Sequence, residues 1–368
     1  MSQLFGRIEE TGVPEIGIVP PELQRIQPHA RKRSKRAKLR AWREHLLDQR
    51  PVDVSVCIAS WNCRDILRSC LQSLHDQPQG VRLETIVVDN ASTDGAADMV
   101  AEEFPEVILQ HNSANMGFAR ANNQAARRAR GRYLFFLNND TVIPHGALAR
   151  LVAFADAHPE VGIVGPRLRD SEGQVQVSYR QRPTVGTLLH RTLLLRWTGI
   201  LRTAYRRYRR QDFDPISTRP VEVLMGAAML LPRHVFGECG GWDEDFAFGG
   251  EDLELSARVG QRYVVVYYPS VEITHHGRAS SRQHIGYVSS NMAIGFLRYL
   301  RKRGYSERTL WAYKLAVTLD APVQLVGKAL QYGWRRLRGR YDKAQKSLLA
   351  MQGFRHFLAK GILPFWKT

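Results

Sequence analysis

Three predicted strands end in polar side chains of the kind that bind metal ions or phosphate groups. The apolar run YLFFL (133–137) is followed at once by two asparagines and an aspartate, and two earlier apolar runs end in a similar way. Carboxylate and amide oxygens are typical ligands of hard divalent cations. The residues concerned are Ser60 and Asn62, Asp89 and Asn90, and Asn138, Asn139 and Asp140.

Each of these groups also has a simpler interpretation, because Asn and Asp are common in turns and bond their own backbone there. In an open α/β sheet, however, the carboxyl ends of the strands share one edge, and ligands bind at that edge. Three successive polar strand ends therefore favour one shared binding site. The sequence has no GxGxxG and no GxxxxGK[ST] loop, which disfavours a dinucleotide enzyme or a P-loop nucleotidase.

A second group of acids lies downstream, in GGWDEDFAFGGEDLEL (240–255). Gly249 and Gly250 permit a tight approach, and Glu251 and Asp252 then open a predicted helix, whose positive dipole end favours carboxylates. Helix capping alone could explain this pair, and a general base is the functional interpretation. His275 follows another predicted strand, where by itself a histidine is a weak signal.

The elements that would position these groups alternate between strand and helix. Apolar runs predict strands at 54–60, 83–89, 106–110 and 133–137. Helical spacing predicts helices over 64–76, 94–103 and 117–130. This alternation predicts an α/β fold with a mostly parallel central sheet and helices on both faces.

The chain divides by pattern and composition into three parts, and the second part contains an insertion. Residues 1–50 form a basic N-terminal extension, with a predicted helix through about Leu47, and residues 51–281 carry the alternating pattern. Within that domain, residues 167–220 are predicted to be a loop-rich insertion. Residues 282–368 are predicted to form basic, amphipathic helices.

The formal net charge of +18 belongs to the flanks of the chain. Residues 31–43 hold eight basic residues and no acid, and from Arg282 onward 17 Lys and Arg stand against three acids. Such flanks suit an anionic partner: lipid headgroups, nucleic acid or a phosphorylated substrate. They are also compatible with a surface that only keeps the protein in solution.

Cysteine use and hydropathy bear on location. The four cysteines show neither zinc-type CxxC pairing nor the density of a disulfide scaffold, which favours a reducing compartment. The N-terminus lacks the apolar core of a secretory signal. No window reaches the ~18 uncharged apolar residues of a membrane-spanning helix. We therefore expect a cytoplasmic protein without a membrane span.

Residues 53–281 resemble the family 2 glycosyltransferases of the GT-A fold, most closely the rhamnosyltransferase-like branch that adds a single sugar. The matching strings occur in the same order and spacing: VSVCIASWN, IVVDNASTDGA, NMGFARANNQA, YLFFLNNDT, MGAAMLLPRHVFGECGGWDEDFAFGGEDLEL and HHGRASS. Their joint arrangement is more specific than any single motif.

The resemblance implies a metal site. The family's Asp-x-Asp motif falls on residues 138–140, so that Asp140 is implied to hold Mg²⁺ or Mn²⁺ against the donor diphosphate and Asn138 stands where the first acid would be. A dication with oxygen ligands would neutralise the charge of the leaving phosphates. A histidine that can complete this site in the family corresponds to His275.

The resemblance also implies a donor site and a base. Asp252 matches the catalytic base of inverting members, and Glu251 is implied to orient Asp252 or the acceptor. Asp89 matches the aspartate that binds the uracil or thymine base. The other residues implied to contact the nucleotide or sugar are Ser60, Asn62, Asn90, Asn115, Gly117, Phe118, Asn122 and Asn138.

The expected function is a metal-dependent, inverting, non-processive transfer of a sugar, with dTDP-L-rhamnose as the favoured donor. The QxxRW motif of processive members is absent, since the nearest string is QYGWRR (331–336). A basic, aromatic C-terminal region suits a helix on an anionic membrane surface, where a polyprenyl-linked acceptor would lie. We therefore expect a peripheral protein on the inner face of the membrane.

Three alternatives remain open at this stage. The same chemistry could use a UDP-hexose or UDP-galactofuranose donor. The chain could be an inactive scaffold in a glycan-assembly complex, although Asp140, Asp252 and His275 are all present. Nucleic-acid binding rests on charge alone and is disfavoured, because the basic flanks enclose a nearly neutral centre.

Overall fold

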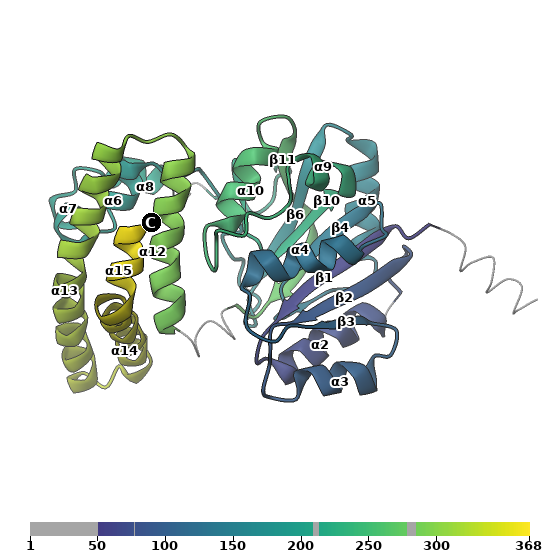
Figure 1. Cartoon of the computed structure of the whole chain (residues 1–368), viewed down its shortest axis with the longest axis horizontal. Coiled ribbons are helices and arrows are strands. Elements are labelled where there is room, and N and C mark those ends of the chain that lie inside the picture. Colours follow the sequence, from purple (N-terminus) through teal and green to yellow (C-terminus); the bar gives the residue numbers. More distant parts are fainter. Residues whose placement is uncertain (1–50, 77, 209–212, 278–284) are drawn as a thin grey trace, which may run out of the picture. The chain divides into compact units, whose positions relative to one another are not determined.

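The computed structural model describes residues 51–76, 78–208, 213–277 and 285–368 (Figure 1). The basic segment 31–43 and the helix predicted before Leu47 lie outside these residues, as does the end of the HHGRASS string. The described residues all belong to one compact unit, 51–368.

Parallel pairing brings three of the predicted strand ends to one edge of the central sheet. The sheet has nine strands, in the order β3-β2-β1-β4-β10-β6-β11-β5, with β8 paired to β11. Neighbours among β3, β2, β1 and β4 are parallel, whereas β10 lies antiparallel between β4 and β6. The strands are β1 (Val54–Ser60), β2 (Leu83–Asp89), β3 (Ile108–His111), β4 (Tyr133–Leu137), β5 (Thr141–Val142), β6 (Val161–Arg169), β8 (Arg219–Pro220), β10 (Ala228–Pro232) and β11 (Val264–His275).

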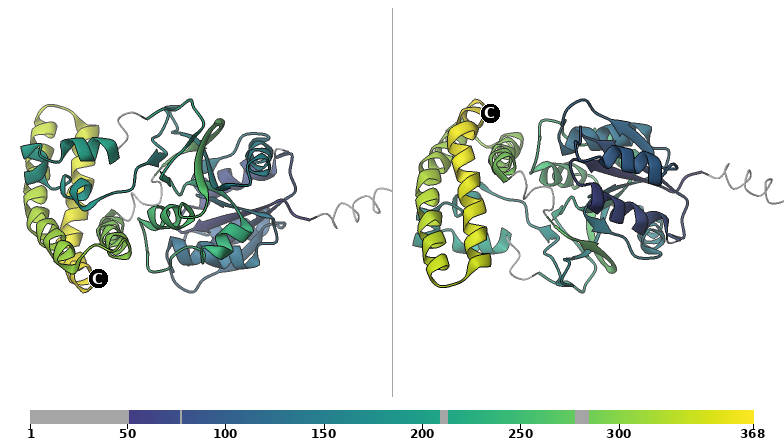
Figure 2. Two further views of the ribbon diagram at one scale, coloured as in Figure 1. Left: turned by 90° about the horizontal axis from the view of Figure 1, so that it is seen from above. Right: turned by 90° about the horizontal axis from the view of Figure 1, so that it is seen from below.

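Helices cover both faces of this sheet (Figure 2). In β1, Val54, Val56 and Ile58 join one core cluster and Cys57 joins the other, as the two-residue period of a strand requires. The expected α/β architecture is therefore confirmed. The first cluster includes α2 (Arg64–His75), α3 (Ala96–Glu103) and α5 (Ala147–Ala157), and the second includes α4 (Phe118–Arg128), α9 (Arg233–Glu238) and α10 (Glu251–Val259).

The segment between β6 and β10 contains more regular structure than its sequence pattern suggests. Strand β6 continues to Arg169, and a two-stranded sheet pairs β7 (Tyr179–Arg180) with β9 (Val223–Leu224). Three short helices lie between them: α6 (Val185–Leu189), α7 (Leu193–Thr198) and α8 (Arg202–Tyr208). Their shortness explains why the helical period is hard to recognise in the sequence.

The C-terminal region is helical, as predicted. Helices α12 and α13 both pack against α14, and Leu297, Leu300 and Leu310 are fully buried in their core. Within the described ranges, no helix is both long and apolar enough to cross a membrane. The elements are α12 (Ile285–Lys302), α13 (Glu307–Leu337), α14 (Tyr341–His356), the π-helical turn η2 (Phe357–Gly361) and α15 (Ile362–Lys367).

Two glycines let α12 approach the loop that precedes α10. A Cβ atom on Gly295 would lie 1.9 Å from the carbonyl oxygen of Gly249, closer than any real contact permits. Gly249 itself has a φ of 81°, in the region that favours glycine. The C-terminal helices are thus seated directly on the loop that leads to Glu251 and Asp252.

We expect Gly295→Ala to destabilise the protein because α12 must move away from Gly249. Overpacking typically costs about 1–3 kcal/mol, more than the up to ~1 kcal/mol that alanine gains over glycine in a helix. Thermal unfolding should show a lower Tm for this variant. The matched control is Gly333→Ala in α13, where a Cβ would meet nothing within 4 Å; its Tm should stay the same or rise. Equal behaviour of the two variants would contradict the close approach.

Candidate active site

A cavity of about 230 Å³ lies at the carboxyl ends of β1, β2 and β4. It is lined by side chains from the turns after these strands, together with residues that precede α10 and residues of α12. Eight predicted site residues line it: Ser60, Asn90, Asn115, Gly117, Phe118, Asn138, Asp140 and His275. Five others lie outside its wall: Asn62, Asp89, Asn122, Glu251 and Asp252.

Asp89 lies behind the wall and carries an unsatisfied oxygen. It pairs in register with Ser60 and is 4% exposed. Its Oδ2 accepts a hydrogen bond from the backbone N–H of Ser92 at 3.1 Å, whereas the buried Oδ1 has no partner among the described residues. A buried acceptor without a donor costs free energy, so a ligand that donates there would be stabilised.

The side chains of Asn62 and Asn122 form hydrogen bonds with the protein's own backbone. The Oδ1 of Asn62 accepts from the N–H of Thr93 at 2.8 Å, and its φ of 50° is one that asparagine tolerates. The Nδ2 of Asn122 donates to the carbonyl oxygen of Phe118, one turn earlier in α4, at 3.1 Å. In the present geometry both side chains shape the loops around the cavity and do not line it.

The loop before α4 forms one wall of the cavity because Gly117 permits a close contact. Its φ is 83°, and a Cβ there would lie 2.7 Å from the carbonyl oxygen of Ala247. Asn115 accepts from the N–H of Gly117 at 2.9 Å, and Asn90 donates to the carbonyl oxygen of Gly117 at 3.4 Å. These bonds join the turn after β2 to the loop before α4.

Asp140 and His275 meet on the opposite wall. The Nε2 atom of His275 lies 3.3 Å from Oδ1 of Asp140 and 3.4 Å from Nδ2 of Asn138. Asp140 and His275 are 5% and 7% exposed. Residues 135 positions apart in the sequence therefore form a buried pair, at the site where the sequence predicted a metal.

Gln176 fixes the protonation of His275. Its Nε2 donates to the carbonyl oxygen of His275 at 2.7 Å, so its Oε1 must be the atom that lies 2.8 Å from Nδ1. Since an amide oxygen only accepts, Nδ1 carries the proton. In a neutral imidazole the lone pair of Nε2 then lies beside both Nδ2 of Asn138, which can donate to it, and the Asp140 carboxylate, where a bound cation would be stabilised.

We expect Gln176→Leu to change the tautomer of His275, because Nδ1–H loses its acceptor while Asp140 can still accept from Nε2–H. Long-range ¹H–¹⁵N NMR at pH 8, where a free imidazole is neutral, should report protonation at Nδ1 in the wild type and at Nε2 in the variant. His275→Asn identifies the signal, and Gln176→Glu, which keeps an acceptor for Nδ1, should retain the wild-type tautomer. The same tautomer in wild type and Gln176→Leu would contradict the assignment.

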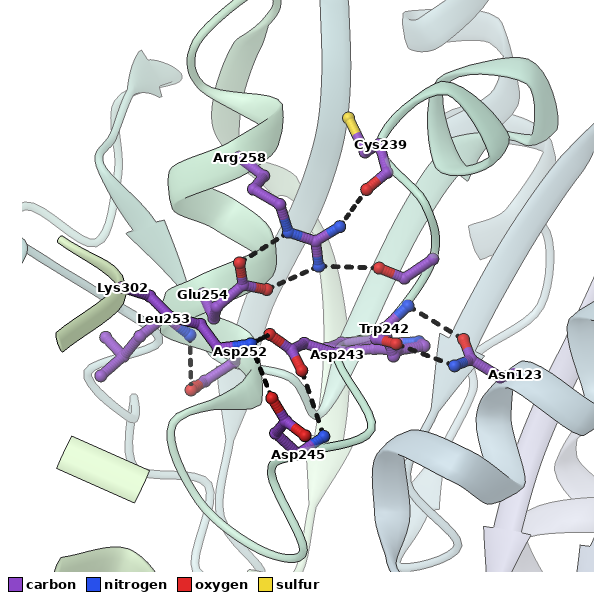
Figure 3. Close-up of polar contacts among 11 residues, drawn as sticks. Asn123, Cys239, Trp242, Asp243, Asp245, Asp252, Leu253, Glu254, Arg258 and Lys302 are labelled. Carbon is purple, nitrogen blue, oxygen red and sulfur yellow. Dashed lines mark hydrogen bonds and ion pairs between the residues drawn. The ribbon is translucent and has the colours of Figure 1, made fainter. Parts of the chain in front are cut away.

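Most of the acidic residues between 243 and 254 are neutralised by cations (Figure 3). Lys302 of α12 pairs with Asp243 and Asp245, and Arg258 pairs with Glu254 within α10. Glu244, which the figure does not show, pairs with Arg120 at 2.8 Å. These four carboxylates are structural. The acidic stretch is thereby reduced to one pair with candidate chemistry, Glu251 and Asp252.

Glu251 and Asp252 have different environments. The Nη2 atom of Arg180 lies 3.2 and 3.0 Å from the two carboxylate oxygens of Asp252. Glu251 has no such cation, and its buried Oε2 has no hydrogen-bond partner among the described residues. Burial, followed by the charge of Asp252, raises the pKa of Glu251 from 4.5 to about 8. At neutral pH, therefore, Glu251 is the neutral acid of the pair.

The raised pKa of Glu251 predicts a pH dependence of stability. The folded protein retains a proton that the unfolded chain has released between pH 4.5 and about 8, so this contribution to stability is complete below pH 4.5 and is lost as the pH rises through 8. Glu251→Gln removes this pH dependence, because glutamine does not ionise. The Tm of the variant should exceed that of the wild type at pH 8.5, where Glu251 is ionised, and should approach that of the wild type at pH 5. The contrasting variant is Glu244→Gln, which loses the Arg120 pair and should have a lower Tm than the wild type at pH 8.5. Parallel wild-type and Glu251→Gln curves would contradict the assignment.

Four further residues contribute to the site, although no motif in the sequence indicates them. Tyr287 and Val288 of α12 line the cavity, and burial together with the nearby Glu251 raises the pKa of Tyr287. Arg180 and Gln176 act through Asp252 and His275. All four belong to the insertion or to the C-terminal helices, outside the motifs, and only the fold brings them to the site.

Comparison with known proteins agrees with these features. Residues 55–219 match the family description "Glycosyl transferase family 2", and residues 220–326 match "Glycosyltransferase like family 2". The two matches are contiguous and together cover the central sheet, the cavity-lining turns and most of α12 and α13.

Among curated relatives, an N-acetylglucosaminyl-diphospho-decaprenol L-rhamnosyltransferase of Mycobacterium tuberculosis is 31% identical over 207 residues, which are 53% of this chain and 66% of the relative. This chain therefore spans just under two thirds of that relative's length. An O-antigen biosynthesis protein of Myxococcus xanthus is 32% identical over 62% of this chain and 18% of its own length. A mannosyltransferase of Pyrobaculum calidifontis, solved with GDP-Man and Mn²⁺, has a TM-score of 0.47 and 20% identity, covering 90% of this chain and 94% of that chain.

Proposed function

The chain belongs to glycosyl transferase family 2 and has its GT-A fold, and from that premise we propose that it transfers a single sugar from a nucleotide diphosphate to an acceptor hydroxyl with inversion. The favoured donor is dTDP-L-rhamnose, supported by the 31% identity to an L-rhamnosyltransferase. The favoured acceptor is a glycan or a glycan on a polyprenyl diphosphate, met at the inner face of the membrane. A UDP-hexose or UDP-galactofuranose donor is the alternative.

The observation that carries this proposal is the buried pair of Asp140 and His275 in the cavity wall. With Nδ1–H bonded to Gln176, Nε2 presents a lone pair beside the Asp140 carboxylate, and an imidazole nitrogen and a carboxylate are both ligand types that a divalent cation binds. Mg²⁺ and Mn²⁺ take few protein ligands when substrate phosphates supply the others. The residues present thus fit Mg²⁺ or Mn²⁺, which when bound would neutralise the charge of the departing diphosphate.

The turns on the other wall would hold the nucleotide and the sugar. The unsatisfied Oδ1 of Asp89 is the acceptor proposed for the N–H of a pyrimidine base. Ser60, the neighbour of Asp89 in register, and Asn90, the next residue in the chain, line the cavity, and the loop at 115–118 would approach the diphosphate and sugar. Asn62 and Asn122 contribute by keeping these two loops in shape, since their amides bond the backbone.

Asp252 is the proposed general base. Its carboxylate would accept the proton of the acceptor hydroxyl while that oxygen attacks the anomeric carbon and the bond to the diphosphate breaks. Arg180 orients the Asp252 carboxylate through its contacts at 3.0 and 3.2 Å. Glu251 is neutral at pH 7, because its pKa is raised to about 8. It can therefore donate a hydrogen bond to the acceptor, and it does not compete with Asp252 for the proton of the acceptor hydroxyl.

The test is thermal stabilisation by dTDP, UDP and GDP, each with Mn²⁺ or with EDTA. A ligand at 100 times its Kd adds about 2.7 kcal/mol of apparent stability, so the expected result is a raised Tm with dTDP and Mn²⁺ that EDTA abolishes. Asp140→Asn should lose the part of the shift that depends on Mn²⁺. Asp252→Asn should keep the whole shift but lower transfer of rhamnose by roughly 10²–10⁴-fold. A response to UDP alone would replace the donor, and no response from folded protein would overturn the proposal.

A further inference from the structure

Helix α13 exposes a continuous row of apolar side chains along its length. Every third or fourth residue from Trp311 to Leu337 is both apolar and exposed: positions 311, 315, 319, 323, 326, 330, 334 and 337, here called the α13 stripe. Leu319, Leu330 and Leu337 are 63, 71 and 89% exposed. At ~1.5 Å per residue the stripe is about 39 Å long.

The stripe is distinct from the face by which α13 joins the protein. At about 100° per residue, its positions fall within an arc of about 140°. The buried residues Leu310, Tyr313 and Ala321 lie on the opposite side, against the core of the C-terminal helices. Trp311 contacts the ring of Trp366, but all eight stripe residues are exposed, and an exposed apolar surface of this length indicates an interaction site.

Helix α7 lies beside α13 and carries a further exposed aromatic side chain. Asp320 accepts from the backbone N–H of Leu193 at 2.6 Å, and Gln324 donates to the carbonyl oxygen of Arg191 at 3.2 Å. On the angular scale above, both positions fall outside the stripe, toward the buried Tyr313, so α7 is attached to that side of α13. It exposes Trp197 to 86%.

Cations border the stripe. On the same angular scale, Arg336 and Arg338 fall on its two sides near its C-terminal end, and both are exposed. The guanidinium of Arg338 lies 4.1 Å from the ring centroid of the stripe residue Trp334. Residues 321–341 contain five Lys and Arg and no acid. An apolar row with an indole and cationic borders matches the depth profile of a membrane interface, where acyl chains, carbonyl groups and anionic headgroups follow one another.

We propose that the α13 stripe is a docking surface for an anionic lipid membrane, with α13 lying in the plane of the interface. A second copy of the chain is a poorer occupant, because it would bring the same cations against one another. The stripe also advances by about 3.7 residues per step, which suits a flat surface better than the 3.5-residue period of a coiled coil.

The inference rests on the proposed function in one respect: it assigns the membrane as the place where the acceptor is met. The C-terminal helices provide the physical connection. Tyr287 and Val288 of α12 line the cavity, α12 packs against α14, and α14 packs against α13. Docking through the stripe would hold the cavity at a fixed height above the bilayer, suited to an acceptor anchored by a polyprenyl chain.

The test is sedimentation of the full chain with phosphatidylcholine vesicles that contain 30% phosphatidylglycerol, at low and at physiological salt. The double variant Leu319→Glu/Leu330→Glu should bind at least tenfold more weakly than the wild type. The control Ile216→Glu/Val264→Glu places the same charges on exposed apolar residues of the sheet domain and should bind within about twofold of the wild type. Arg336→Gln/Arg338→Gln should weaken binding to these vesicles and reduce its salt dependence.

Several outcomes would overturn the inference: no binding by the wild type, equal loss in the stripe and control variants, or a wild-type dimer that the stripe variant converts to monomer in analytical ultracentrifugation. Nucleotide stabilisation, measured on the same samples, separates the two proposals. Vesicle binding without a nucleotide shift would leave the docking surface standing and remove the proposed transferase activity. A nucleotide shift without vesicle binding would support the proposed transferase activity and overturn the docking surface.

Discussion

The in-register parallel pairing of β1, β2 and β4 is the constraint on which the site depends. Ser60 pairs with Asp89, and Val54 pairs with both Leu83 and Tyr133, so these strands end at one edge of the sheet. A shift of one residue would turn every side chain of a strand to the opposite face, so that each core cluster would lose the strand side chains it now contains. The hydrophobic cores therefore fix the register, and the register in turn brings the cavity-lining residues Ser60, Asn90 and Asp140 to one edge of the sheet.

The carboxylates near this cavity differ in the partners that surround them. On one side, cations neutralise Asp243, Asp245, Glu244 and Glu254 and leave them to hold α12, α4 and α10 in place. On the other, Asp140 faces the lone pair of His275. Glu251 and Asp252 are adjacent in sequence, yet among the described residues only Asp252 forms an ion pair, with Arg180. The different environments of these two neighbouring carboxylates are a result of tertiary contacts.

The sequence was sufficient for the parts of the fold that have a strong period. The strands at 54–60, 83–89 and 133–137 and the helix that opens at Glu251 agree with the structure, because long apolar runs and Gly-Gly boundaries are local signals. The antiparallel insertion of β10 and the short helices of the 170–222 segment have no such signal. The motifs likewise placed Asp140 and His275, but Gln176, Arg180 and Tyr287 reach the site only through tertiary packing.

The contact of Arg180 with Asp252 has a consequence for how such chains can diversify. Arg180 belongs to β7, in the segment between β6 and β10, whereas Asp252 opens α10. Recombination that exchanges residues 170–222 for the corresponding piece of a relative would replace the partner of the carboxylate along with the loops. Variation in that segment is therefore coupled to the state of Asp252. A chimera that imports the segment would have to import a matching arginine as well.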